Sequence, residues 1–265
     1  MSFDPLNYTM SDPFPVTQPG DLKSSYTTAE CIKKYMPGQV AQTWDPLYGW
    51  RHFKLVKNLY GAALAQGQLV SNVGSASIGT VTAGTTTQIT TSGQTANDFE
   101  YQMIVVADDN GGAGAAPEGE AALCVGNTAS IVDLHKDYAF TTAVAVSDSV
   151  YVVYTNAVTL GVTGDLRGTP SDDKKVQGIV YSEAPADNSW FWILQKGWGR
   201  VLCTDALTND CDIIQGSTSG YAAAFSAAHE TVIGQCPVAQ LAGSESGYAT
   251  VYLDCRDVIF QTGTP

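Results

Sequence analysis

The sequence predicts an all-β protein, an antiparallel sandwich or barrel body with an extended N-terminal arm and little helix. Short stretches rich in β-branched and aromatic residues recur along the chain, separated by Gly, Asn and Asp turns, which is the pattern of short strands. No long segment shows the 3.6-residue apolar period of a helix. The 26 glycines among 265 residues also favour frequent turns.

The first 57 residues are predicted to form the arm. An aromatic cluster lies near its end, and a capping box at Thr27–Glu30, stopped by Pro37 and Gly38, predicts one short helix at about Cys31–Tyr35. Proline breaks regular ladders and favours an extended path. Six of the eleven prolines lie in the first 46 positions: Pro5, Pro13, Pro15, Pro19, Pro37 and Pro46.

The arm also differs from the rest of the chain in charge. Six basic residues oppose five acidic ones in residues 1–57, whereas seven oppose 21 in the remainder. A segment of this kind has no core of its own, so it either wraps its own body or becomes ordered against a partner. The candidate partner-interface residues are Phe14, Trp44, Tyr48, Trp50 and Phe53.

Residues 58–97 carry no formal charge and are rich in Gly and Thr, which predicts a β segment. Its edges lack the lysines that usually protect exposed strands, so either a neighbouring subunit covers them or the segment is a surface hairpin. Residues 98–265 are predicted to form the β body. Its expected strands are 101–106, 149–154, 176–181, 190–195, 200–203 and 250–253, with a turn at 197–199.

The formal charge of −13 excludes a generic electrostatic nucleic-acid binder. No apolar run approaches the roughly 20 residues that span a bilayer, so no membrane partner is expected. The start, Met1–Pro5, lacks the basic and apolar regions of a signal peptide. The six cysteines are scattered without a C-x-x-C pair, and we expect them to be reduced and mostly buried.

No motif in the chain predicts catalysis, so we expect a protein that is not an enzyme, with no catalytic residues, no cofactor and no metal. The histidines His52, His135 and His229 have no second histidine at ligand spacing, and the pair His229–Glu230 does not extend to H-E-x-x-H. Neither a G-x-S-x-G elbow nor a phosphate-binding loop is present.

One acidic segment leaves an alternative open. Asp108, Asp109 and Asn110 precede two glycines, and Glu118 and Glu120 follow a Gly/Ala stretch. Clustered carboxylates suit calcium, but the spacing is not that of an EF-hand, and Asp-Asn-Gly is ordinary turn chemistry. We expect a turn, with calcium binding as the alternative.

Three tryptophans leave a second alternative open. Strand alternation places Trp190 and Trp192 on one face and Phe191 and Ile193 on the other, which is typical of a strand buried between layers. The alternatives are an exposed platform for sugars, which would include Trp198, and a subunit interface.

Seven segments follow one another in a recognisable order: Gly61–Val70, Val105–Gly112, Val125–Ala129, Ala143–Val152, Trp190–Leu202, Ile233–Ala239 and Tyr248–Leu253. This order of motifs over residues 40–255 resembles that of decoration (cement) and related virion structural proteins of tailed bacteriophages. The acidic turn here is lengthened by Ala113–Ala116, the cysteines are more numerous, and residues 1–40 have no counterpart.

The resemblance implies a protein without an active site that binds the outside of an icosahedral capsid and stabilises it. Its partners would be the major capsid protein and further copies of itself, typically as a homotrimer, and it would be made in the host cytoplasm. The alternatives are a receptor- or glycan-binding virion module, such as a head fibre or tail component, and another assembly component such as a tail tube or head-completion protein.

Overall fold

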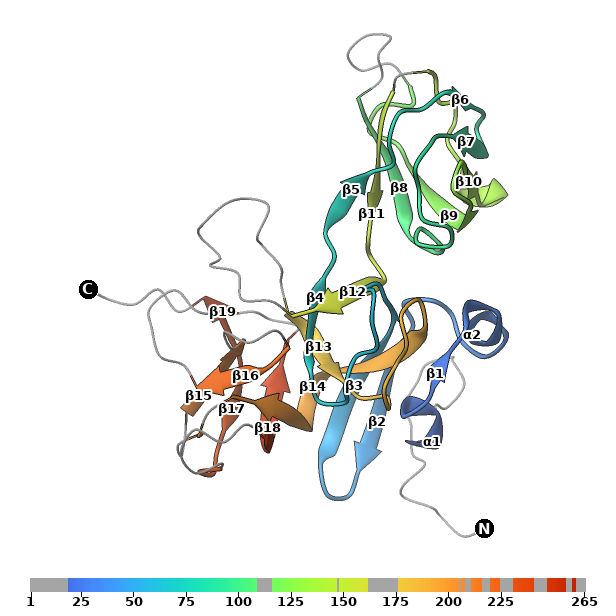
Figure 1. The fold of residues 1–265 in the computed structure, drawn as a ribbon. Helices are drawn as coiled ribbons and strands as arrows, with labels where there is room; N and C mark the ends of the chain where they lie inside the picture. The colour runs from blue at the N-terminus through green and yellow to red at the C-terminus, as the bar shows by residue number, and fades with distance from the viewer. Residues whose placement is uncertain are drawn as a thin grey trace, which may run out of the picture. The chain divides into compact units, whose positions relative to one another are not determined.

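The computed structural model describes residues 19–108, 116–146, 148–161, 176–204, 206–207, 211–215, 220–224, 231–240, 247–255 and 259–260. They form two compact units, one within residues 1–72 and 158–265 and the other at residues 73–157 (Figure 1). The predicted all-β class with little helix is confirmed. The helices of the described residues are α1 (Pro19–Leu22), α2 (Thr28–Lys34) and a 3-10 turn at Lys136–Tyr138.

The larger unit is built on a twelve-stranded sheet of order β16-β15-β17-β18-β14-β13-β4-β12-β3-β2, with β1 beside β14 and β19 beside β17. Its strands are β1 (Ser25–Tyr26), β2 (Val40–Asp45), β3 (Gly49–Asn58), β4 (Leu69–Asn72), β12 (Ala157–Leu160), β13 (Val176–Val180), β14 (Trp190–Cys203), β15 (Cys211–Gln215), β16 (Ala222–Ala224), β17 (Thr231–Cys236), β18 (Gly247–Asp254) and β19 (Ile259–Phe260).

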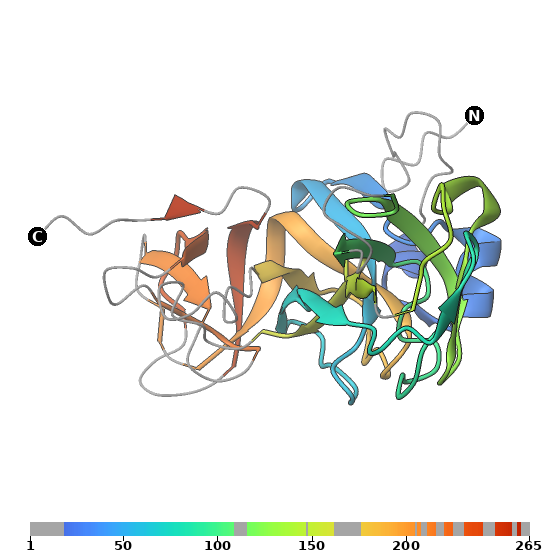
Figure 2. The ribbon, with the colours of Figure 1, turned by 90° about the horizontal axis from the view of Figure 1, so that it is seen from above.

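The long strand β14 joins the two halves of this sheet. Its first half pairs with β3 and its second half with β18, so in Figures 1 and 2 it runs between the blue strands and the red ones. The change of partner coincides with a register shift next to Gly197, which has φ +108°. A Cβ at this position would lie 2.7 Å from the Trp50 carbonyl oxygen, so only glycine fits. The predicted turn at 197–199 is therefore wrong, because these glycines lie inside one continuous strand.

Of the two alternatives for the N-terminal segment, residues 19–57 follow the first, because they belong to the larger unit and pack on it. Strand β1 pairs with β14, with Tyr26 opposite Trp190. Trp190 and Trp192 are fully buried, and the Tyr35 ring lies edge-on to Trp192 with the centroids 5.5 Å apart. Covering two tryptophans removes a large apolar area from water, and this is why the segment packs on its own body despite its prolines. The buried interpretation of Trp190 and Trp192 is confirmed.

The predicted short helix is confirmed as α2. The Thr27 side chain accepts a hydrogen bond from the Glu30 amide, and the Glu30 carboxylate accepts one from the Thr27 amide, which completes the capping box. Cys31 is buried on the inner side of the helix. The cap fixes where the helix starts, so that Tyr35, which follows its last turn, meets Trp192.

The second unit is one sheet of seven strands in the order β5-β11-β8-β9-β10-β7-β6. Strand β9 links the two parts of this sheet, since its first three residues pair with β8 and its later residues with β10. One apolar core forms inside and includes Ile78, Val106, Val132 and Val150. The strands are β5 (Ser75–Ser77), β6 (Ala83–Gly84), β7 (Gln88–Thr90), β8 (Met103–Asp108), β9 (Ala121–Asn127), β10 (Ile131–Leu134) and β11 (Ser149–Val153).

The second unit is an insertion in the larger one. It leaves the large sheet after β4 and returns at β12, and these strands pair with each other, with Asn72 opposite Val158. The expected boundaries at residues 57 and 97 are therefore wrong. Residue 57 lies inside β3, the uncharged segment 58–97 contributes to both units, and the segment 98–265 is divided between them.

Because the ends of the insertion are adjacent, we expect both units to fold alone. A chain in which an Asn-Gly turn replaces residues 73–157 should keep a cooperative thermal transition, and so should the fragment 73–157, since each has its own core. Circular dichroism and amide hydrogen exchange measure this. Loss of cooperative unfolding in both fragments would show that the units form a single folding unit.

Candidate functional site

The hairpin formed by β2 and β3 has two different faces because its residues alternate. Ala41, Thr43, Arg51 and Phe53 are buried. The intervening residues point to the opposite face, where the register pairs Val40 with Lys54, Gln42 with His52 and Trp44 with Trp50. β2 is the last strand of the sheet order, so the hairpin forms one edge of the sheet.

The turn and the strands of the hairpin present apolar side chains to solvent. Leu47 is 77% exposed, Val40 is 56% exposed and Trp50 is 43% exposed. The Asp45 carboxylate accepts hydrogen bonds from the Leu47 and Tyr48 amides at 2.8 and 3.1 Å, which fixes the turn. We call Val40, Trp44, Leu47 and Trp50 the hairpin surface. Isolated exposed apolar residues are ordinary, but several of them on one hairpin with a fixed turn suit a protein contact.

Only part of the predicted interface set lies on this surface. Trp44 and Trp50 do, as a cross-strand pair. The interface prediction is wrong for Phe53, because its side chain is fully buried on the inner face of the hairpin. Phe14 lies outside the described residues. Leu47 was missed because only aromatic residues were considered, although its place between Pro46 and Gly49 in a turn indicates exposure.

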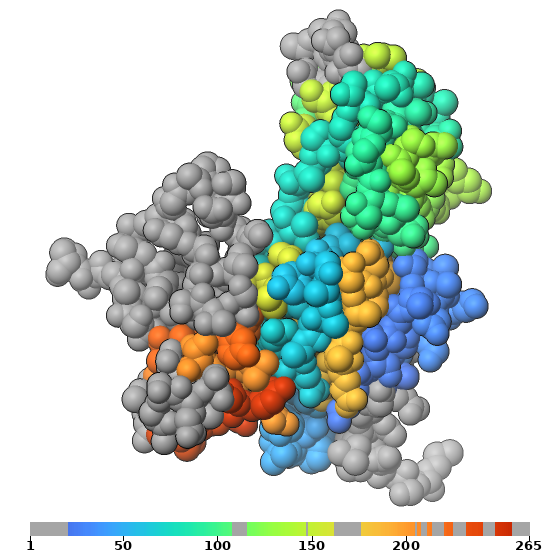
Figure 3. Space-filling view, viewed as in Figure 1, coloured from blue at the N-terminus to red at the C-terminus, as the bar shows by residue number. Residues whose placement is uncertain are grey.

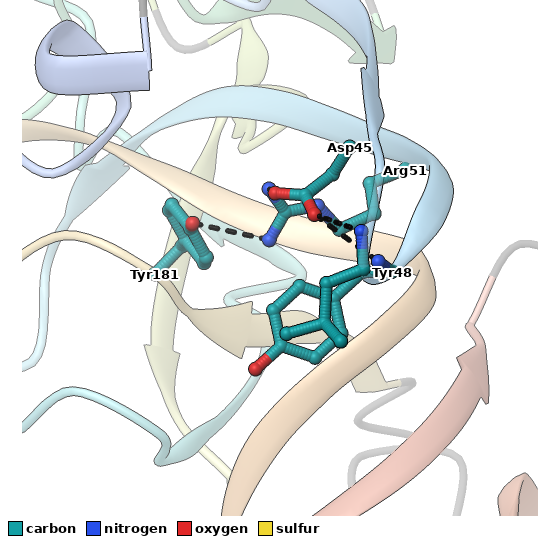
Figure 4. Close-up of polar contacts among 5 residues, drawn as sticks. Asp45, Tyr48, Arg51 and Tyr181 are labelled. Atoms are coloured by element: carbon teal, nitrogen blue, oxygen red, sulfur yellow. Dashed lines mark hydrogen bonds and ion pairs between the residues drawn. The ribbon is translucent and has the colours of Figure 1, made fainter. Parts of the chain in front are cut away.

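Arg51 lies on the inner face and is only 6% exposed. Its Nη2 atom lies 3.0 Å from the Asp45 carboxylate, and its Nη1 donates a hydrogen bond to the Tyr181 hydroxyl at 3.1 Å (Figure 4). The guanidinium also lies 5.3 Å from the ring centroids of Tyr48 and Tyr181 and 5.5 Å from that of Phe53. The hairpin, its turn and the end of β13 therefore hold the guanidinium in one position.

Arg51 is part of the lining of a cleft of about 210 Å³ in the larger unit. Four further segments complete its walls, and they contribute Lys23 after α1, Gln66 before β4, Val180 and Tyr181 at the end of β13, and Trp198 and Arg200 from the second half of β14. We call this cleft, which Tyr48 and Tyr181 also line, the basic cleft.

Hydrogen bonds and stacking hold the wall of the basic cleft. The Arg200 guanidinium lies 4.3 Å from the centroid of the Tyr248 ring, and the Tyr248 hydroxyl donates to the Gln66 carbonyl oxygen at 3.1 Å. Gln66 Nε2 in turn donates to the Tyr181 carbonyl oxygen at 2.8 Å. This cleft could not be predicted from the sequence because its residues come from five separate segments, and only Trp198 had been considered for ligand contact.

The two histidines among the described residues, His52 and His135, belong to different units. His52 lies on the outer face of the hairpin, opposite Gln42. His135 Nδ1 accepts a hydrogen bond from the Asp137 amide at 3.2 Å and caps the 3-10 turn. His229 lies outside the described residues, within which no three His, Cys, Asp or Glu side chains are grouped as for a metal ion.

Most of the acidic turn, residues 109–115, lies outside the described residues, so the calcium alternative is untested. Of its two glutamates, Glu120 accepts hydrogen bonds from the hydroxyl and the amide of Thr141. These bonds lower the pKa of Glu120 below its usual value, because they favour the charged carboxylate. Glu120 therefore ties two loops of the second unit together.

The cysteine side chains are buried apart from Cys211, which is half-buried. Burial raises the pKa of the Cys31 thiol to about 12, so this cysteine stays protonated. Among the described residues, no helix has the length and apolar character needed to span a bilayer. Comparisons with protein-family models, with curated proteins and with solved structures give no match for this chain.

Proposed function

We propose that this chain is a non-enzymatic structural protein of a tailed-bacteriophage particle that binds the outer surface of the icosahedral shell and stabilises it. The hairpin surface carries the proposal, because it places Leu47 and the Trp44–Trp50 pair on solvent at the edge of a sheet. Tryptophan is among the residues that contribute most to protein interfaces. We propose the major capsid protein as the partner because the order of motifs in this chain resembles that of cement proteins.

The support of the hairpin makes it a suitable contact element. Strand β3 pairs with β14 from Trp190 to Lys196, so the hairpin is held by the centre of the sheet. A contact surface that is already rigid loses little conformational entropy when it binds. Each contact would be small, but many copies on one shell, or three contacts in one trimer, add avidity.

Self-association is proposed for the second unit. Strands β5 and β6 are the two ends of its sheet, and β5 is exposed along Ser75–Ser77. No charged residue in 58–97 protects these edges against pairing. A homotrimer formed through such edges would remove them from solvent.

The test is binding of the purified full chain to empty shells assembled from the capsid protein encoded in the same genome. We expect the chain to co-sediment with these shells. The double variant Leu47→Asp, Trp50→Asp should bind at least about 30-fold more weakly, because it places two charges in an apolar contact. Its fold should persist, since both side chains are exposed.

The matched control is the double variant Tyr138→Asp, Val238→Asp, whose side chains are 64% and 61% exposed and lie away from the hairpin sequence. It should bind shells as tightly as the parent chain. Failure of the parent chain to bind, or equal binding by the hairpin variant, would overturn the proposal. Loss of binding by both double variants would show a general effect of charge and would count against the hairpin.

A further inference from the structure

We infer that the basic cleft binds a sugar ring that carries a carboxylate, as in an acidic monosaccharide unit of a glycan. This binding site is separate from the hairpin surface and does not depend on shell binding. Of the sugar platform considered from the sequence, only Trp198 lines this cleft, since the side chains of Trp190 and Trp192 are fully buried.

The charge of the cleft is opposite to that of the chain. The chain as a whole carries −13, yet Lys23, Arg51 and Arg200 all line this one cleft. Asp45 balances Arg51, which leaves Lys23 and Arg200 as excess positive charge among the lining residues. Clustered cations in a concave site attract an anion more strongly than the same cations on a flat surface.

Arg51 supplies a donor whose position is fixed. Its Nε atom is buried and has no hydrogen-bond acceptor among the described residues, although a guanidinium offers five N–H donors in a fixed fork. The guanidinium lines the cleft and is held in one position, so a carboxylate bound there would match the geometry of its fork.

The walls of the cleft favour a ring over a bare ion. Trp198, Tyr48 and Tyr181 line it, and flat aromatic side chains suit the apolar face of a sugar ring. The Gln66 amide and the tyrosine hydroxyls provide polar groups of the kind that sugar hydroxyls need. The volume of about 210 Å³ is below the roughly 300–1,000 Å³ of sites for drug-sized ligands, so it suits a single ring.

The experiment titrates the full-length protein with sodium glucuronate and follows the tryptophan indole N–H signals by NMR. Neutral glucose and inorganic phosphate are titrated in parallel at the same ionic strength. We expect saturable shifts with glucuronate at millimolar concentrations or below. Affinity for glucose and for phosphate should be at least about 10-fold weaker, because glucose lacks the charge and phosphate lacks the ring.

The variant Arg200→Gln should weaken glucuronate binding about 10-fold, and Arg200→Lys should restore part of the loss, since it restores the charge without the fork. Arg200 is exposed, so the fold should be retained. The control Lys136→Gln, an equal loss of charge on an exposed side chain of the second unit, should bind as the parent does.

No saturable shift with glucuronate would overturn the inference. Equal affinity for glucose, equal affinity for phosphate, or unchanged binding by Arg200→Gln would each do the same. Shell binding is measured separately with the hairpin variant, so the two proposals can fail independently.

Discussion

Replacement of Trp192 by alanine is expected to lower the free energy of unfolding of the larger unit by about 3–5 kcal/mol. Trp192 is fully buried, lies in register with Leu55 of β3, and packs edge-on against Tyr35. Its removal leaves a cavity between β14 and the segment that covers it. Urea denaturation measures the loss, and the second unit, which has its own core, should unfold as before.

The control is Trp50→Ala, which removes the same side chain from a position that is 43% exposed. Its cost should be about 1 kcal/mol or less, mainly from the lost cross-strand contact with Trp44. Trp192→Phe tests the same site with a smaller change, and a cost between those of the two alanine variants is expected. Equal costs for Trp192→Ala and Trp50→Ala would contradict the described packing.

Replacement of Asn58 by alanine is expected to cost about 3 kcal/mol, because it leaves buried backbone groups without partners. The Asn58 Nδ2 atom donates to the carbonyl oxygens of Ala62, Pro185 and Ala186 at 2.9–3.1 Å. Its Oδ1 accepts from the Tyr60 amide at 3.0 Å. These bonds join the segment after β3 (cyan) to the segment before β14 (gold), which lie side by side in Figure 3.

Asn156→Ala is the matched control, because Asn156 is half-buried and its side-chain amide donates to one carbonyl oxygen among the described residues, that of Tyr101 at 3.2 Å. A cost of about 1 kcal/mol or less is expected. Calorimetry on the full chain separates the effects, since Asn58 belongs to the larger unit and Asn156 to the second. If the two variants lose the same stability, the network around Asn58 does not hold these segments together.

Local patterns predicted the elements that depend on local interactions. The capping box of α2 and the alternating strands at 149–154 and 176–181 appear close to their expected places, as α2, β11 and β13. Two strands were expected where β14 runs unbroken, since a glycine in a strand can mark either a turn or a close backbone contact. Here Gly197 marks the contact with Trp50.

The division of the chain into units was not predictable from composition. Proline and aromatic content suggested an arm, but the deciding factor is that Tyr26 and Tyr35 cover buried tryptophans of β14. Likewise, Asn72 and Val158 are adjacent only through pairing of β4 with β12, and no linker composition marks either end of the insertion. Contacts between distant segments decide both features.

The two candidate sites also differ in how far the sequence could predict them. Trp44 and Trp50 could be chosen from the sequence because clustered aromatic residues near a turn often lie at an interface. The basic cleft could not, because Lys23, Arg51 and Arg200 become neighbours only through the fold. Phe53 was assigned to the interface because composition cannot tell which face of a strand a residue occupies until the register is known.

The proposed function is tested most directly by an electron cryomicroscopy reconstruction of a tailed-phage particle made from the genome that encodes this chain. We expect density for the chain on the outside of the head, with the hairpin surface of Val40, Trp44, Leu47 and Trp50 against a shell subunit. A particle in which the chain is absent from the head, or in which the hairpin surface points into solvent, would contradict it.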